Sequence, residues 1–303
     1  MQLLTRSDFD GLACGALLKK AGVVDGFKFV HPKDIQDGIV EATENDVLAN
    51  IPYIPGCGIW FDHHSSEIER VGDVDVPGDR RVTPSCARIV FDYYGGKEKF
   101  PHLAQMIDYV DRVDSADLTA EEVSDPKGWV LLGFLMDPRT GLGRFREFRI
   151  SNYDLMQILL DACAELSIEE ILDLPDVRER VELYLEQNAQ FGGMVEQYSK
   201  VYNNCLVTDL RGVETIYSGN RFLPYGLYPE TNISLWIVDG RGKQNCPIAC
   251  GHSTINRSSR TNVGSLMLKY GGGGHERVGT CQVDYGEADR VIAELVEKIN
   301  ADG

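Results

Sequence analysis

The sequence predicts an α/β protein with a mainly parallel sheet flanked by helices, followed by a second, smaller α/β domain with a mixed sheet. Short apolar runs alternate with helical segments in the first half, which is typical of βαβ units. Beyond residue 201 the texture changes to short strand-like runs. A length of 303 residues suits two domains better than one. We expect a cleft between them, because candidate site motifs occur in both halves.

The elements follow from apolar periodicity and from Gly, Pro and capping residues. The strands expected in the first domain are residues 3–5, 27–30, 46–49 and 58–61. The helices expected there are residues 12–20, about 85–95, one opening at Pro101, and segments between about 153 and 172. The strands expected in the second domain are residues 205–208, 213–217, 233–238 and 247–251, before a final amphipathic helix over residues 288–299.

A long polar helix over about residues 176–199, interrupted or softened at Gly192 and Gly193, is expected to link the two domains. This gives a first domain of residues 1–190 and a second of residues 200–303. We find no internal repeat and no low-complexity tract.

Composition narrows the functional classes. Hydrophobic residues make up 43% of the chain, but no stretch approaches the ~20 apolar residues that span a bilayer. The N-terminus lacks a secretory layout, so we expect a cytoplasmic protein without membrane contact. A net charge of −17 argues against long duplex nucleic acid, although it permits a short phosphorylated substrate in a locally compensated pocket. The eight cysteines form no Cys-x-x-Cys pair and are expected to be reduced and buried.

Acidic and imidazole side chains directly follow two of the expected strands. Asp8 and Asp10 lie in the loop after the first strand, and Asp62-His63-His64 follows the strand that ends at Phe61. The carboxyl ends of parallel strands are where open α/β sheets bind ligands. Two carboxylates in one loop can converge on a cation, and neutral imidazole is a good ligand for Mn, Fe or Zn. The alternatives are helix capping for the aspartates and a polar turn for Asp-His-His.

Four aspartates lie around the end of the helix that opens at Pro101: Asp108, Asp111, Asp114 and Asp117. At about 100° per residue, Asp114 falls in line with Leu103, Ile107 and Val110 on the apolar face. A carboxylate at the buried end of such a face needs a cation or several hydrogen-bond donors. Asp114 is therefore the candidate ligand, and the alternative is a solvated acidic helix end.

A glycine run near the C-terminus is followed by a histidine. Residues 271–274 are all glycine and precede His275, an arrangement that lets backbone amides and an imidazole meet an anion. No Gly-Lys-Ser/Thr follows, so it is not a Walker loop. Upstream, Arg257 and Arg260 carry charges suited to phosphate. A flexible turn and ordinary surface arginines are the alternatives.

The ordered combination of Asp-x-Asp-Gly, Asp-His-His and a C-terminal Gly-Gly-Gly-Gly-His resembles the DHH phosphoesterase superfamily along essentially the whole chain. The resemblance implies an N-terminal DHH domain, a C-terminal DHH-associated domain, and phosphoester hydrolysis with two divalent ions, usually manganese. The metal residues that it implies are Asp8 for one ion and Asp10, His63 and Asp114 for the other. It further implies that His64 and His275 face the phosphate and that Asp62 orients a histidine. Together with the residue chemistry above, this gives a substrate-binding set in the second domain of Arg257, Gly272, Gly273, Gly274 and His275.

Two positions depart from the family pattern. Arg6 stands where the family has a histidine or an aspartate, and Asn50 stands where it has an aspartate bridging both metals. Asp46 is an alternative bridge, but it lies at the far end of its strand. A guanidinium cannot coordinate a metal, whereas it can pair with Asp8 and bind phosphate. We therefore expect Arg6 to act in catalysis and one Mn²⁺ to be held rather than two, with Mg²⁺ or another divalent ion as an alternative.

The leading hypothesis is a metal-dependent phosphoesterase acting on a small phosphorylated substrate such as a nucleotide or short single-stranded oligonucleotide. The alternative is a non-catalytic nucleotide or phosphate-binding protein whose metal site has degenerated. A homo-oligomer is compatible with the sequence. The sequence does not name the substrate.

Overall fold

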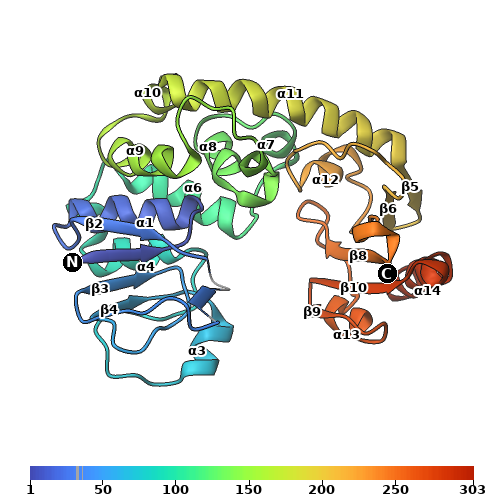
Figure 1. Ribbon diagram of the computed structural model, residues 1–303, viewed down its shortest axis with the longest axis horizontal. Helices are drawn as coiled ribbons and strands as arrows, with labels where there is room; N and C mark the ends of the chain where they lie inside the picture. The colour runs from blue at the N-terminus through green and yellow to red at the C-terminus, as the bar shows by residue number, and fades with distance from the viewer. Residues whose placement is uncertain (32–33, 36) are drawn as a thin grey trace. The chain divides into compact units, whose positions relative to one another are not determined.

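The computed structural model describes residues 1–31, 34–35 and 37–303, which divide into two compact units. The first unit contains Met1–Asp117 and Pro126–Leu183, and the second contains Leu118–Asp125 and Tyr184–Gly303. Figure 1 colours the chain from blue to red along this order. Among the described residues, no helix combines the length and apolar character needed to cross a membrane.

The first unit is built on a four-stranded parallel sheet in the order β2-β1-β3-β4. Its strands are β1 (Gln2–Thr5), β2 (Gly26–Phe29), β3 (Asp46–Ala49) and β4 (Ile59–Phe61). Every residue of β3 is buried, as expected for a parallel sheet that is covered on both faces. Because side chains alternate along a strand, Leu4 and Leu48 join a cluster with Trp60 on one face, while Leu3 lies against helix α1 on the other.

Helices cover this sheet and bring charged residues to its carboxyl edge. Helix α1 is buried from Phe9 to Leu18 and packs against α4, α6 and α9 (Figure 1). The helices of this unit are α1 (Phe9–Lys20), α3 (Ser65–Val71), α4 (Cys86–Tyr93), α5 (Gly96–Lys99), α6 (Ala104–Asp114), α8 (Gly128–Met136), α9 (Asn152–Glu165), α10 (Ile168–Asp173) and the first part of α11 (Pro175–Tyr198). Two short 3₁₀ turns, η1 (Pro138–Thr140) and η2 (Leu142–Arg144), follow α8.

The second unit contains a six-stranded mixed sheet in the order β5-β6-β7-β8-β10-β9. The β6–β7 pair is parallel and the other pairs are antiparallel. Its strands are β5 (Ser199–Tyr202), β6 (Cys205–Asp209), β7 (Ile233–Ile237), β8 (Asn245–His252), β9 (Gly273–His275) and β10 (Val278–Asp284). Its helices are α7 (Ala120–Ser124), α12 (Leu223–Leu227), α13 (Val263–Leu268), α14 (Ala288–Asp302), the short turns η3 (Arg241–Lys243) and η4 (Tyr285–Glu287), and the rest of α11. One apolar core joins this sheet to α13 and α14.

The predicted α/β class, the parallel sheet and the second mixed sheet are confirmed. Two local expectations are wrong. Residues 213–217, expected as a strand, are irregular, and their apolar side chains pack instead against a cluster around Phe191. Helix α11 continues through Gly192 and Gly193 without a break, because its packing fixes the backbone there.

Candidate metal centre

The loop between β1 and α1 brings Asp8 and Asp10 to the carboxyl edge of the first sheet. Asp8 is the N-cap of α1, and its Oδ1 accepts a hydrogen bond from the Gly11 amide at 2.9 Å. Gly11 is required here because a Cβ would lie 2.0 Å from the Arg6 carbonyl oxygen. The tight turn fixes both carboxylates relative to the strand.

Asp10 is buried and accepts hydrogen bonds from the first two amides of α4. Its Oδ2 accepts from Cys86 N at 2.9 Å and its Oδ1 from Ala87 N at 2.7 Å. Burial nevertheless raises the pKa of Asp10 well above its ordinary value, and the charges of Asp114 and Asp8 raise it further. A carboxylate in this position calls for a cation beside it.

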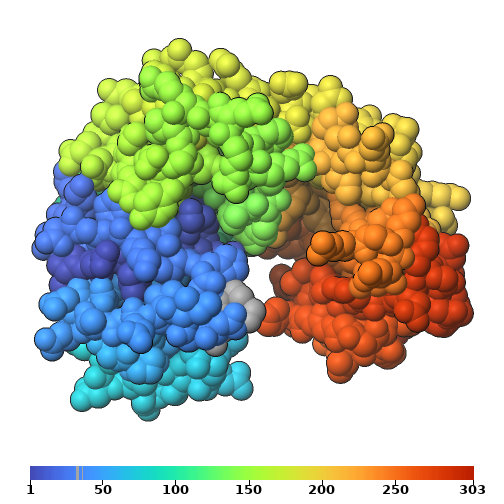
Figure 2. Space-filling model, viewed as in Figure 1, coloured from blue at the N-terminus to red at the C-terminus, as the bar shows by residue number. Residues whose placement is uncertain are grey.

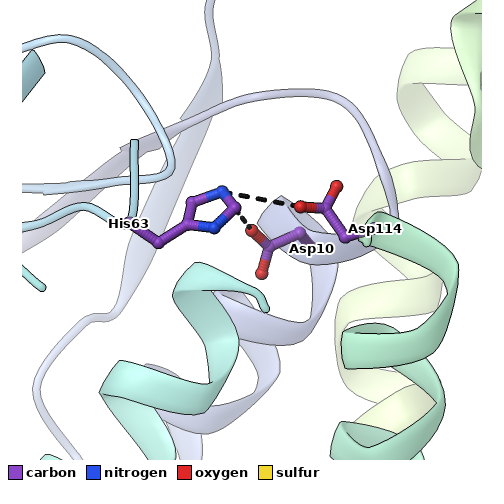
Figure 3. A group of neighbouring side chains, drawn as sticks. All are labelled: Asp10, His63 and Asp114. Carbon is purple, nitrogen blue, oxygen red and sulfur yellow. Dashed lines mark ion pairs between the residues drawn. The ribbon is translucent and has the colours of Figure 1, made fainter. Parts of the chain in front are cut away.

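The His63 ring faces two carboxylates from other elements (Figure 3). Its Nδ1 lies 3.1 Å from the Thr83 carbonyl oxygen, which can only accept, so Nδ1 carries the hydrogen. The other ring nitrogen, Nε2, lies 3.7 Å from Asp10 Oδ2 and 3.5 Å from Asp114 Oδ2. Nε2 is buried and has no hydrogen-bond partner among the described residues.

Asp114 is the last residue of α6, and it joins Asp10 and His63 across the sheet edge. One ligand atom from each of the three residues lies within 4.8 Å of the others. We expected Asp114 on the buried face of its helix, but its side chain is 30% exposed. The difference arises because the helix ends at this residue, so the carboxylate has solvent on one side and the other two groups on the other.

These three side chains fit a divalent cation. A neutral Nε2 presents a lone pair, and facing it with two carboxylates is repulsive unless a positive charge lies between them. Imidazole and carboxylate together form the donor set that Mn²⁺ accepts. The Thr83 carbonyl fixes the ring orientation from outside, as is usual for a metal-bound histidine.

Asp8 lies next to this group but has other partners. Its Oδ2 is 3.0 Å from Arg6 Nε, and its Oδ1 also accepts a hydrogen bond from Asn50 Nδ2 at 3.0 Å. Burial raises the pKa of Asp8, and the Arg6 guanidinium opposes that rise. Arg6 and Asn50 thus both contact the carboxylate for which the resemblance implies a metal.

Asp62 holds His64 beside the centre. Asp62 is completely buried, and its Oδ1 accepts hydrogen bonds from the backbone amides of His63 and His64. His64 Nδ1 lies 2.7 Å from the same oxygen. Burial acts to lower the pKa of His64, but the hydrogen bond to Asp62 and its charge outweigh this and raise it. The half-exposed His64 ring therefore has one nitrogen fixed and the other accessible.

The neighbouring aspartates have structural partners. Asp111 accepts from Ser85 Oγ at 2.6 Å and from Arg88 Nε at 2.8 Å, and the exposed Asp108 pairs with the same arginine. Asp46, at the opposite end of β3 from Asn50, accepts from the Thr43 amide and hydroxyl. None of these carboxylates belongs to the Asp10–His63–Asp114 group.

The remaining predicted residues lie in the second unit. The amides of Gly271 and Gly272 donate to carbonyl oxygens of Leu268 and Met267, so they end α13 and do not form a free anion nest. Gly273, Gly274 and His275 form edge strand β9, on which His275 is exposed. In the loop before α13, the exposed Arg257 donates from Nε to the Thr254 carbonyl at 3.0 Å.

Sequence reasoning missed the backbone groups that organise the centre, namely the Thr83 carbonyl and the amides of Cys86 and Ala87. The only available signal was the Thr-Pro-Ser helix start, which predicts a helix N-terminus but not what it binds. Backbone contacts leave no residue-type signature.

Proteins similar to this chain are found among solved structures. A scan against protein-family models and a search of curated proteins found no match. Among solved structures, a pGpG-specific phosphodiesterase, PggH from Vibrio cholerae, is 51% identical, with 100% of this chain and 99% of that chain covered and a TM-score of 0.91. RecJ from Thermus thermophilus, solved in complex with Mn²⁺, is 13% identical, with 99% of this chain and 52% of that chain covered and a TM-score of 0.50.

The likeness to RecJ shows the fold alone, whereas identity of 51% over the full length shows the family. The chain belongs to the DHH superfamily of phosphoesterases, hydrolases that depend on divalent metal ions.

Proposed function

We propose that this protein hydrolyses the phosphodiester bond of pGpG to release GMP, with one divalent ion, Mn²⁺, held by Asp10, His63 and Asp114. The substrate is inferred from the full-length identity of 51% with a pGpG-specific phosphodiesterase. The observation that carries the metal site is the buried, unpartnered His63 Nε2 facing two carboxylates. A dinucleotide is also short enough to approach a chain of net charge −17.

One ion is proposed because Asp8 is the only anionic ligand left at the second site, where Arg6 and Asn50 take the other two positions. Asp8 is contacted by Arg6 on one oxygen and by Asn50 and Gly11 on the other. A positive guanidinium beside Asp8 disfavours a second cation there. Asn50 supplies a neutral amide, which cannot bridge two divalent ions as a carboxylate does.

A bound ion would polarise a phosphoryl oxygen and lower the pKa of a water molecule. The chain's own groups complete the chemistry. Arg6, steadied by Asp8, binds a non-bridging phosphate oxygen in the place left by the second cation. His64, whose Nδ1 faces Asp62, donates a hydrogen bond from Nε2 to the phosphate, and its raised pKa favours the protonated ring.

We assign substrate binding in the second unit to Arg257, Gly272, Gly273, Gly274 and His275. Gly273, where a Cβ would meet nothing within 4 Å, leaves the backbone of edge strand β9 open beside the exposed His275, which suits close approach of a nucleotide. Gly272 and Gly274 let this segment lie close to β10. Arg257 is exposed and carries a positive charge. The alternative of a non-catalytic binding protein is weaker, because the similar protein of known activity is a hydrolase.

The direct test is hydrolysis of pGpG by the purified protein with added Mn²⁺, followed by chromatography of the nucleotides. We expect stoichiometric conversion to GMP, no conversion in EDTA, and much slower cleavage of pApA and of oligonucleotides longer than three residues. Binding of pGpG without any turnover would support the non-catalytic alternative. Equal cleavage of all these substrates would refute the proposed specificity.

A further inference from the structure

Arg139 lies in the 3₁₀ turn η1, directly after α8, and has no role in the function described so far. Its backbone amide and its Nε both donate to Asp137 Oδ1, at 2.9 and 2.7 Å. Thr140, which is buried, donates to the Asp137 carbonyl at 2.8 Å. These bonds fix the base of the guanidinium, while neither terminal nitrogen makes a hydrogen bond within the described residues.

Helix α8, which leads into this turn, packs against the segments that carry Asp10 and Asp114. Gly133 approaches so closely that a Cβ would lie 3.1 Å from the Phe9 ring and 3.0 Å from Val113 Cγ1. The Trp129 ring stacks on Phe9, with 6.1 Å between the centroids. Phe9 lies between Asp8 and Asp10 in the sequence, and Val113 precedes Asp114. Helix α8 therefore packs against both segments that carry the carboxylates.

Electrostatic interactions also link Arg139 to the carboxylates of the metal centre. Arg139 interacts electrostatically with Asp8 and Asp114, and together with Asp137 they raise its pKa against the lowering effect of burial. In return, the positive charge of Arg139 helps to lower the pKa of Asp8. Arg6 and Arg139 therefore both place a positive charge near the Asp8 carboxylate, in a chain that is strongly acidic as a whole.

We propose that Arg139 is a substrate-binding residue whose terminal amino groups bind a phosphate oxygen of the nucleotide at the metal centre. This rests on the proposed function and extends it to a residue outside the Asp-x-Asp and Asp-His-His motifs. A guanidinium fixed at Nε presents two parallel donors that match two phosphate oxygens. The segment that follows α8 is light green in Figure 2 and lies at the surface of the first unit. It ends near the exposed Arg149, which already pairs through Nε and Nη2 with Asp176.

The test compares Arg139→Gln with wild type in steady-state hydrolysis of pGpG with Mn²⁺. Loss of a charged hydrogen bond made to both substrate and transition state should raise KM about 10- to 100-fold while kcat changes little. Arg139→Lys should recover part of the loss, because it keeps the charge without the fork. Bound Mn²⁺ and the melting temperature should be unchanged, and Arg149→Gln is the matched control, with KM at the wild-type value.

Repeating the comparison with GpG, which lacks the 5′-phosphate, shows which phosphate is bound. If the KM effect disappears, Arg139 binds the terminal 5′-phosphate, and if it persists, Arg139 binds the phosphodiester. An unchanged KM on both substrates, in a protein that hydrolyses pGpG, would overturn the role of Arg139 while leaving the proposed function intact.

Failure of the wild-type protein to hydrolyse pGpG would count against the proposed function instead. Arg139 is then judged by calorimetric titration of the Mn²⁺-loaded protein with GMP. Weaker binding by Arg139→Gln than by wild type would support phosphate binding at Arg139. Equal affinity, or no binding by wild type, would overturn it.

Discussion

At the scale of single residues, Asp114 and Asp108 share helix α6 but lie in different surroundings. Asp114 lies with Asp10 and His63 in the candidate metal group. Asp108 is 69% exposed and pairs with Arg88, and Arg88 also pairs with Asp111. We predict that Asp114→Ala lowers Mn²⁺ affinity by more than the roughly 10- to 100-fold expected for an outer partner and abolishes turnover. Asp108→Ala should leave both near wild type.

Calorimetric titration with Mn²⁺ and an activity assay measure this contrast. The pair is informative because both variants remove one carboxylate from the same helix and change the net charge equally. Wild-type metal affinity in Asp114→Ala would mean that the ion is held elsewhere.

Arg6 is one of the two positions that depart from the family pattern, and its replacement tests what the guanidinium does. Removing its guanidinium takes away the cation that lowers the pKa of the buried Asp8 and the proposed phosphate contact. We predict that Arg6→Ala loses about 100- to 1,000-fold in kcat/KM, the usual cost of deleting one electrostatic contact to the transition state. Metal content should stay at one ion per chain, and Arg290→Ala, on the exposed face of α14, should be neutral.

The residue scale also shows what sequence can and cannot predict. Asp10 and His63 could be predicted as neighbours in a site because each comes directly after a strand, and the carboxyl ends of parallel strands lie at one edge of the sheet. The helical phase selected Asp114 among four aspartates but not its exposure, which depends on where the helix ends. Arg139 carries no such pattern, since its position depends on how α8 packs.

At the scale of elements, α8 is a helix that apolar periodicity could not predict. Seven of its residues are buried on all sides, so the sequence reads as a plain apolar run with no polar face. The strand expected at residues 213–217 failed for a related reason: alternating apolar residues there pack on a cluster without joining the sheet. In both cases tertiary packing, rather than local preference, decides the outcome.

The contact of α8 with the centre gives an element-scale prediction. Gly133→Val would add a branched side chain where even a Cβ already crowds Phe9 and Val113. Overpacking of this kind costs roughly 1–3 kcal/mol of unfolding free energy, and here it should also weaken Mn²⁺ binding by displacing the carboxylate segments.

Denaturant unfolding and Mn²⁺ titration test this prediction against Gly193→Ala in α11. A Cβ at Gly193 meets nothing within 4 Å, so that change should stabilise the helix by about 1 kcal/mol and leave metal binding alone. Normal metal affinity in Gly133→Val would show that α8 does not position the centre.

At the scale of the whole molecule, the chain leaves the first unit at residues 118–125 and returns to it at Pro126. This excursion belongs to the second unit, where Asn220 Nδ2 donates to the Val123 carbonyl at 2.9 Å. No composition shift marks it, because it is defined by a contact almost a hundred residues away. The order of a parallel sheet followed by a mixed sheet, by contrast, could be predicted, because strands and helices alternate along the first half of the sequence and short strands follow one another in the second.

Metal binding should stabilise the molecule as a whole. Asp8, Asp10 and Asp114 repel one another, and burial disfavours charge on the first two. A cation present at 100 times its Kd that binds only the folded state adds about 2.7 kcal/mol, which corresponds to a rise of about 4 °C in melting temperature for a chain of 303 residues. We predict this rise for wild type with Mn²⁺ and none for Asp114→Ala, as measured by scanning calorimetry. An equal rise in both proteins would contradict the assignment.

The most direct test of the central claim is the number of tightly bound Mn²⁺ ions per chain, measured by elemental analysis after saturation and gel filtration. The arrangement of Arg6, Asp8 and Asn50 predicts one ion, and Asp114→Ala should retain none. Two ions per wild-type chain would contradict the account, because they would require Arg6 to leave Asp8 and a neutral Asn50 to share a divalent pair.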